Sequence, residues 1–126
     1  MSAPDLISTS HSPGEKTGNT TFYMGHGRTG EWKLVGIGIV PTQTCSGASN
    51  VFSIAFTQGT ATVATTLLTS ATALTAGTAV QATMTGSAGS DAEFGPTDSV
   101  KMVCTETAGS ATLECQFICH WQKARV

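Results

Sequence analysis

Residues 51–66 read VFSIAFTQGTATVATT, in which two stretches rich in β-branched and aromatic residues flank Gln58-Gly59. A two-residue connection containing glycine between two such stretches is typical of a β-hairpin. Pairing Thr57 with Thr60 makes one face of this hairpin apolar and leaves the other face small and uncharged. The apolar face then consists of three cross-strand pairs: Phe52 with Thr65, Ile54 with Val63, and Phe56 with Ala61. The stretch predicts two antiparallel strands, over 51–57 and 60–66.

Upstream of this hairpin, two more stretches have the composition of strands. Residues 20–24 form a short candidate, and residues 31–40 form a longer one whose glycines, Gly36 and Gly38, argue against a helix. Strict alternation along 31–40 divides its large residues into two sets: Val35, Ile37 and Ile39 on one face, and Trp32, Leu34 and Val40 on the other. Both stretches are expected to join the same antiparallel fold.

Downstream, residues 67–90 are expected to be irregular with one strand near 80–84, and residues 86–97 to form a polar loop. Strands over 100–105 and 112–121 are expected to form a second hairpin around Ala108-Gly109-Ser110, because one register brings their apolar sides together. In that register the opposed pairs are Val100 with Phe117, Met102 with Cys115, and Cys104 with Leu113. About seven strands separated by turns predict a single antiparallel β-sandwich or jelly-roll-like domain over 20–126.

Residues 1–19 differ from the rest of the chain in composition. Prolines and glycines stand there among polar residues, and Leu6-Ile7 is the one large apolar pair. Such a stretch is predicted to be an extended N-terminal arm, either disordered or laid on a partner.

The charges are unevenly distributed. From Leu34 to Ser90 no residue is charged and none is histidine. A free monomer usually intersperses charges over its surface and protects strand edges with Lys or Pro, and this stretch has only Pro41 for that purpose. A surface covered by neighbouring subunits is therefore favoured, and a Thr/Ala-rich surface kept soluble by its hydroxyls is the alternative.

The overall composition excludes several classes of protein. Thr, Ala, Gly and Ser make up half of the chain, and six Lys and Arg against eight Asp and Glu give a net charge of -2. Binding to nucleic acid through phosphate contacts would require a basic surplus. No apolar run is long enough to cross a bilayer, and no secretory signal pattern opens the chain. We expect no nucleic-acid partner, no membrane partner and reduced cysteines.

Residues 25–30 read GHGRTG and match the G-x-G-x-x-G dinucleotide fingerprint. That fingerprint needs a helix after it to hold the pyrophosphate, and the strand-like stretch 31–40 follows instead. A turn between two strands is the favoured interpretation. We expect no cofactor.

The cysteines and histidines carry no recognisable catalytic or metal-binding pattern. Cys115 and Cys119 would lie about 13 Å apart at ~3.3 Å per strand residue, too far to share a metal or a disulfide. Cys104 and Cys115 could pair if the predicted register slipped by two residues, but buried thiols are favoured. The three histidines, His11, His26 and His120, are expected on the surface. The acidic residues Asp91, Glu93 and Asp98 lack the spacing of a calcium loop, so we expect no metal site.

Residues 34–121 resemble a loose group of small tailed-bacteriophage virion proteins. The resemblance rests on residues 34–41, the turn 46–50, the strand 51–56, the turn 95–100 and the closing hairpin. It implies a β-sandwich of the capsid decoration (cement) or head-fibre type, which binds the major capsid protein, often as a homotrimer, without chemistry. The extended arm and the uncharged stretch agree with such an interface.

We therefore expect a non-enzymatic protein that assembles in the host cytoplasm and stabilises the exterior of a capsid by binding across subunit joints. The expected contact residues are Leu6, Ile7, Phe22 and Tyr23, followed by Trp32 and Trp121, for which a core position is the favoured alternative. The nearest competing function is a tail or head-fibre module that recognises a host-surface ligand. A small hydrolase or metal-binding enzyme, or a major tail-tube or shell subunit, is less favoured.

Overall fold

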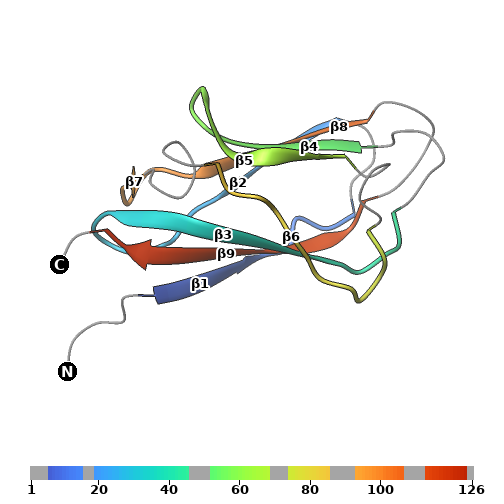
Figure 1. The fold of residues 1–126 in the computed structure, drawn as a ribbon, viewed down its shortest axis with the longest axis horizontal. Helices are drawn as coiled ribbons and strands as arrows, with labels where there is room; N and C mark the ends of the chain where they lie inside the picture. The colour runs from blue at the N-terminus through green and yellow to red at the C-terminus, as the bar shows by residue number, and fades with distance from the viewer. Residues whose placement is uncertain are drawn as a thin grey trace.

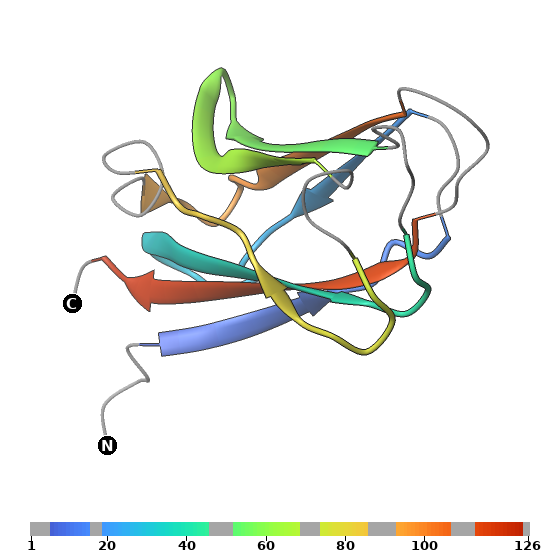
Figure 2. The same cartoon turned by 45° about the vertical axis from the view of Figure 1, so that its right-hand side comes forward.

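The computed structural model describes residues 6–15, 19–45, 52–68, 74–85, 93–106 and 113–124, with only the backbone described for 65–68. Two antiparallel sheets pack face to face as a β-sandwich, which confirms the predicted fold class (Figures 1 and 2). One sheet has the strand order β1 (Leu6–His11), β9 (Cys115–Lys123), β3 (Trp32–Pro41) and β6 (Val80–Gln81), with β7 (Glu93–Phe94) also paired to β3. The other has the order β2 (Thr20–Met24), β8 (Val100–Glu106), β4 (Phe52–Gln58) and β5 (Ala61–Leu68). Among the described residues, no helix is long and apolar enough to span a membrane.

The core lies between the two sheets and is built by alternation. In β4, β8 and β9 every second side chain is buried, as period-two side-chain geometry requires. The largest fully buried side chains come from both sheets: Trp121, Phe52, Phe56, Phe94, Phe117, Met24, Leu34, Ile37, Ile39, Ile54, Leu74 and Met102. These side chains, contributed by the inner faces of both sheets, form the core between them.

The hairpin expected over residues 51–66 is present as β4 and β5, but its register differs from the expected one. Gln58 pairs with Ala61, so the turn residues are Gly59 and Thr60. Gly59 takes a φ of 61°, a left-handed conformation that favours glycine at the first turn position. Two register shifts then interrupt the pairing, and they bring both Val63 and Ala64 into the core. Sequence alternation alone does not reveal such irregularities.

The second hairpin expected from the sequence is wrong. β8 pairs with β2 and β4, whereas β9 pairs with β1 and β3 in the opposite sheet. The apolar sides of these two strands do face the same core, but they face it from opposite layers. Matching apolar faces are produced equally by strands that pair edge to edge and by strands that pack across a sandwich.

The N-terminal arm expected over 1–19 is replaced, in its described part, by a strand of the domain. β1 pairs antiparallel with β9 along its whole length, from Leu6 opposite Gln122 to His11 opposite Phe117. Its side chains alternate between exposed and half-buried, and Ile7 packs against the core. Burial of the apolar surface on this inner face stabilises the pairing of β1 with β9. Residues 1–5 and 16–18 lie outside the described part.

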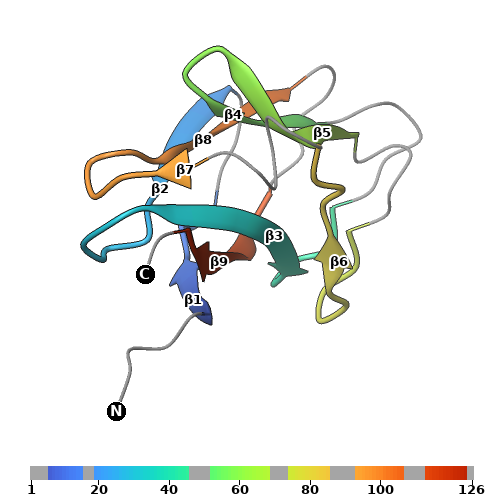
Figure 3. The ribbon, with the colours of Figure 1, turned by 60° about the vertical axis from the view of Figure 1, so that its left-hand side comes forward.

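The strand expected near 80–84 is present in a shorter form, and it joins the two sheets. β6 pairs with β3 through Ile39 opposite Val80, and a few residues later the Thr85 amide donates to the Val63 carbonyl of β5 at 3.2 Å. Figure 3 shows this segment passing from β3 across to β5. It therefore covers the side of the sandwich formed by those two strands. The loop expected over 86–97 contains the short strand β7, and residues 69–73 and 86–92 lie outside the described part.

A β-bulge in β3 corrects the predicted division of its side chains into two faces. Leu34 pairs with Trp121 and Gly36 with His120, so Val35 is an extra residue in β3. The bulge lets Trp32 and Leu34 on one side of it, and Ile37 and Ile39 on the other, all point into the core. Val35 is instead 37% exposed.

This bulge predicts different outcomes for two single-residue deletions. Deleting Val35 leaves a regular alternation of Leu34, Gly36 and Ile37, so we expect the fold to be retained with a loss below about 2 kcal/mol. Deleting Gly38 forces the large residues on one side of the deletion to the outer face. Each of them then loses about 1.5–3 kcal/mol of burial free energy, and the sum approaches the whole stability of a domain. Urea unfolding of the two variants tests this. Equal loss of stability in both would contradict the assignment of Val35 as the extra residue.

Candidate interaction surface

The edges of the sandwich differ in how well they are covered. β1 ends one sheet and β2 ends the other, and neither has a further strand neighbour in the described part of the chain. The two strands approach each other where the rings of His11 and Phe22 meet, with centroids 6.3 Å apart at an angle of 71°. We call β1 and β2 together the open edge.

The open edge lacks the features that usually protect exposed strands. β1 reads LISTSH and β2 reads TTFYM, with no Lys, Arg, Asp, Glu or Pro in either. Unpaired strand edges present a row of amide and carbonyl groups that can pair with another chain, and natural proteins normally block them with charges or proline. The open edge is thus chemically suited to receiving another strand.

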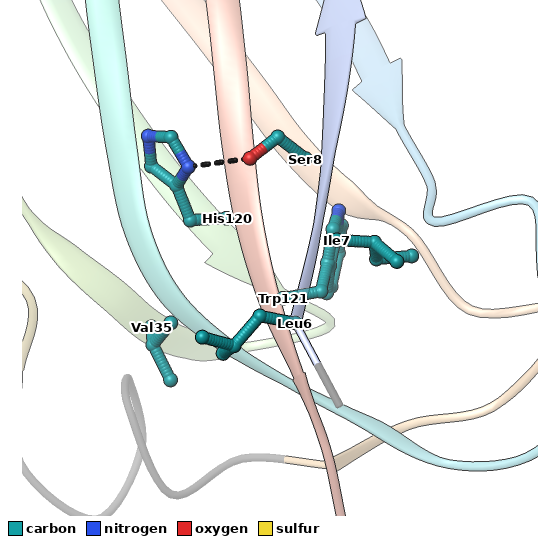
Figure 4. A pocket seen from close by; sticks show the side chains of 6 residues that line it. All are labelled: Leu6, Ile7, Ser8, Val35, His120 and Trp121. Carbon is teal, nitrogen blue, oxygen red and sulfur yellow. Dashed lines mark hydrogen bonds between the residues drawn. The ribbon is translucent and has the colours of Figure 1, made fainter. Parts of the chain in front are cut away.

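Exposed apolar side chains gather on and beside the open edge. Among the described residues, the large hydrophobic side chains with high exposure are Leu6 at 66%, Tyr23 at 60% and Val35 at 37%. Leu6 and Val35 belong to an open pocket of about 300 Å³ (Figure 4), whose lining residues are Leu6, Ile7, Ser8, Val35, His120 and Trp121. Sequence alternation assigned Val35 to the same face as Ile37, so its place in this pocket was missed. The signal available was that strict alternation places Trp32 and Leu34 on one face and Ile37 and Ile39 on the other, and one extra residue between the two pairs would bring all four to the same face.

The contact residues expected from the sequence fall into three groups. Leu6 and Tyr23 are well exposed, whereas Ile7 and Phe22 are half-buried and pack against the core. The tryptophans are buried, Trp32 at 5% exposure and Trp121 at 0%. Their indole N–H groups donate internally, Trp32 Nε1 to the Thr29 carbonyl at 3.0 Å and Trp121 Nε1 to Thr9 Oγ1 at 2.9 Å. The tryptophans therefore act as core residues, and they offer a partner little surface.

Ser8 and His120 meet at the pocket as a hydrogen-bonded pair, with 2.8 Å between Ser8 Oγ and His120 Nδ1 (Figure 4). A serine beside a histidine is a feature of nucleophilic catalysis, but that chemistry also needs a group that orients the histidine. In the described part of the chain no carboxylate bonds His120, and the two residues are direct cross-strand partners in β1 and β9. The pair therefore serves to tie β1 to its neighbour.

His26 is buried at 3% exposure, which corrects the expectation that the histidines lie on the surface. Its Nδ1 accepts the Arg28 backbone N–H at 3.0 Å, so Nε2 carries the proton. Nε2 then lies 3.0 Å from the Phe94 carbonyl and 2.9 Å from the Gly95 carbonyl. This histidine fixes the 25–30 turn against β7. Strand β3 follows the turn, so the helix required by a dinucleotide fingerprint is missing.

Replacing His26 by alanine is expected to destabilise the fold by about 2–4 kcal/mol. The change leaves a cavity and removes the hydrogen-bond partner of two carbonyls and one amide in a buried site. The half-buried His120 offers a matched control, because His120→Ala is expected to cost about 1 kcal/mol. Thermal or urea unfolding measures both. Equal losses would show that His26 is not a specific structural residue.

His11 should make stability depend on pH near neutrality. Burial lowers the pKa of the His11 imidazole below its ordinary 6.5, because desolvation disfavours the charged ring. Protonation therefore occurs more readily in the unfolded chain, so the stabilising effect is complete above pH 6.5 and is lost as pH falls through the folded pKa. Urea unfolding between pH 7.5 and 5 should show a steeper decline for the wild type than for His11→Gln. Parallel curves would contradict this role.

The cysteines are buried and offer little chemistry. Cys45, Cys104, Cys115 and Cys119 all lie in the core. Burial raises the pKa of Cys119 to about 12, and burial together with nearby Cys45, Cys104 and Glu114 raises that of Cys115 to about 12. Thiols with such pKa values are poor nucleophiles and poor metal ligands at neutral pH.

Among the described residues, the features that could contact a partner are the unpaired backbone edges of β1 and β2 and the exposed apolar side chains near them. No three of the described His, Cys, Asp and Glu side chains are grouped to hold a metal ion. In the acidic loop, Asp98 accepts a hydrogen bond from the Gly95 amide at 2.8 Å, and Asp91 lies outside the described part.

Comparisons of the chain with protein-family models, with curated proteins and with solved structures find no match.

Proposed function

We propose that this protein is a non-enzymatic structural component of a tailed-phage virion, which decorates the capsid exterior and binds across joints between major capsid protein subunits. The observation that carries this proposal is the open edge. Its two strands have no Lys, Arg, Asp or Glu, and they carry the exposed side chains of Leu6 and Tyr23. An edge of this kind is a hazard in a free monomer and useful in a permanent assembly.

The binding would combine two physical effects. Backbone groups of β1 or β2 would pair with an extended neighbour, which gives directional contacts without requiring charged side chains. Burial of each large apolar side chain would add about 1.5–3 kcal/mol. Such contacts, repeated at every joint of a shell, resist separation of its subunits. Assembly in the host cytoplasm and a homo-oligomeric state belong to the same proposal and come from the resemblance. The resemblance favours a trimer, whereas the strand pairing argued in the next subsection favours a dimer, and the mass of the protein in solution distinguishes the two.

Tyr23→Ser is expected to weaken binding to capsids that lack this protein by at least about tenfold, since about 1.4 kcal/mol corresponds to tenfold in affinity. Ala79→Ser is the matched control, because Ala79 is exposed in the turn before β6, away from the open edge. Co-sedimentation, quantified as copies per particle, measures both variants. Saturation by the wild type at a symmetric copy number supports the proposal.

Few or no bound copies of the wild type would contradict capsid decoration. The competing function, a tail or head-fibre module, would then be tested by binding of the isolated protein to host-surface glycans. Equal occupancy by Tyr23→Ser and the wild type would remove β2 from the contact while leaving decoration in place.

A further inference from the structure

We propose that the protein self-associates through β1, which pairs antiparallel with β1 of a second copy about a twofold axis. The two five-stranded sheets would then join into one continuous sheet. This inference concerns contacts between copies and does not depend on the capsid role.

The geometry of β1 meets the requirements for pairing on its outer side. One side of the strand is paired with β9 from Leu6 to His11, so its backbone is already extended and held in register. In an antiparallel strand, alternate amide and carbonyl groups point away from the existing neighbour. No described residue pairs with them on that side. Six residues of preformed edge are therefore available.

The sequence of β1 is complementary to itself. With the axis at Thr9, Thr9 faces Thr9 of the second copy, Ser8 faces Ser10, and Ile7 faces His11. This register preserves the two faces, because the exposed residues meet exposed ones and the half-buried residues meet half-buried ones. Cross-strand Thr–Thr and Ser–Ser pairs are favourable, and a strand without charge places no like charges opposite each other.

The other strand edges are less suited to a twofold pair. The β3 and β5 edges are bridged by the segment that includes β6 and Thr85. β2 offers an edge of five residues, one fewer than β1, and it carries the exposed Tyr23 that the proposed capsid contact requires.

Pairing through β1 would also cover Leu6, the most exposed large apolar side chain among the residues that the structure describes. In the Thr9-centred register, the chain that follows His11 in the second copy runs past Leu6, which is 66% exposed in one copy alone. Tyr23 on β2 would stay accessible. One strand of the open edge would then serve contacts between copies, and the other would remain available for the capsid.

The first test is the mass of the purified protein in solution without capsids, measured by sedimentation equilibrium over a range of concentrations. A monomer–dimer equilibrium or a stable dimer is expected. A purely monomeric protein or a trimer would overturn the inference.

The second test is a cysteine cross-link that reports which strands meet. Oxidation of an equimolar mixture of Ser8→Cys and Ser10→Cys should give a disulfide-linked dimer, because these positions face each other across the axis. The native cysteines are at most 3% exposed, so the wild type supplies a low background. Thr78→Cys, exposed in a turn away from β1, is the control that should not cross-link. The contrary result is a dimer that forms no cross-link, either in the mixture or with each variant alone. In that case the contact lies elsewhere and the proposal is overturned.

Unfolding curves of the variants establish that each one folds, since Ser8 bonds His120 and the substitution could weaken β1. The outcomes also separate the two proposals. A cross-linked dimer that fails to bind capsids contradicts decoration alone, whereas a monomer that binds capsids contradicts self-association alone.

Discussion

The buried indole of Trp121 is the contact on which the open end of the sandwich depends. Its ring lies 5.3 Å from the rings of both His26 and Phe94, edge to face in each case, and its N–H bonds Thr9 of β1. One side chain on β9 therefore joins the edge strand, the 25–30 turn and β7. β1 has β9 as its strand neighbour, so the position of the edge follows from how this ring is packed.

Strand β9 therefore links the packing of the core to the exposed surface. The same β9 strand directs Trp121 inward and His120 outward, and both side chains bond β1. The bulge at Val35 allows β3 to keep Leu34 opposite Trp121 while exposing one apolar residue beside the pocket. Core packing thereby sets the shape of the surface that a partner would meet.

Local features of the fold were predictable from the sequence, and non-local ones were not. The 51–66 hairpin follows from composition and one glycine turn, and the inward alternation from Cys115 to Trp121 is correct. The pairing of β8 with β9 was wrong because an apolar face does not identify which sheet its strand joins. The bulge in β3 was missed because it interrupts the alternation on which the prediction rested.

The candidate surface was predictable to a similar extent. The sequence predicts Leu6 and Tyr23 as contact residues, and both are exposed, but the same reasoning also includes the tryptophans, which are buried. The burial of His26 depends on carbonyls nearly 70 residues away in the chain, at Phe94 and Gly95, which no local pattern reports.

The pairing of β1 with β9 also has a consequence for synthesis on the ribosome. Ser8 and His120 are 112 residues apart in the chain, yet they are direct neighbours in the sheet. At roughly 5–20 residues per second, β1 is made several seconds before the strand that holds it flat. Until β9 emerges, β1 lacks the neighbour that holds it extended and in register, so it does not yet present the preformed edge. The order of the strands therefore postpones formation of this edge until nearly all of the domain has been synthesised.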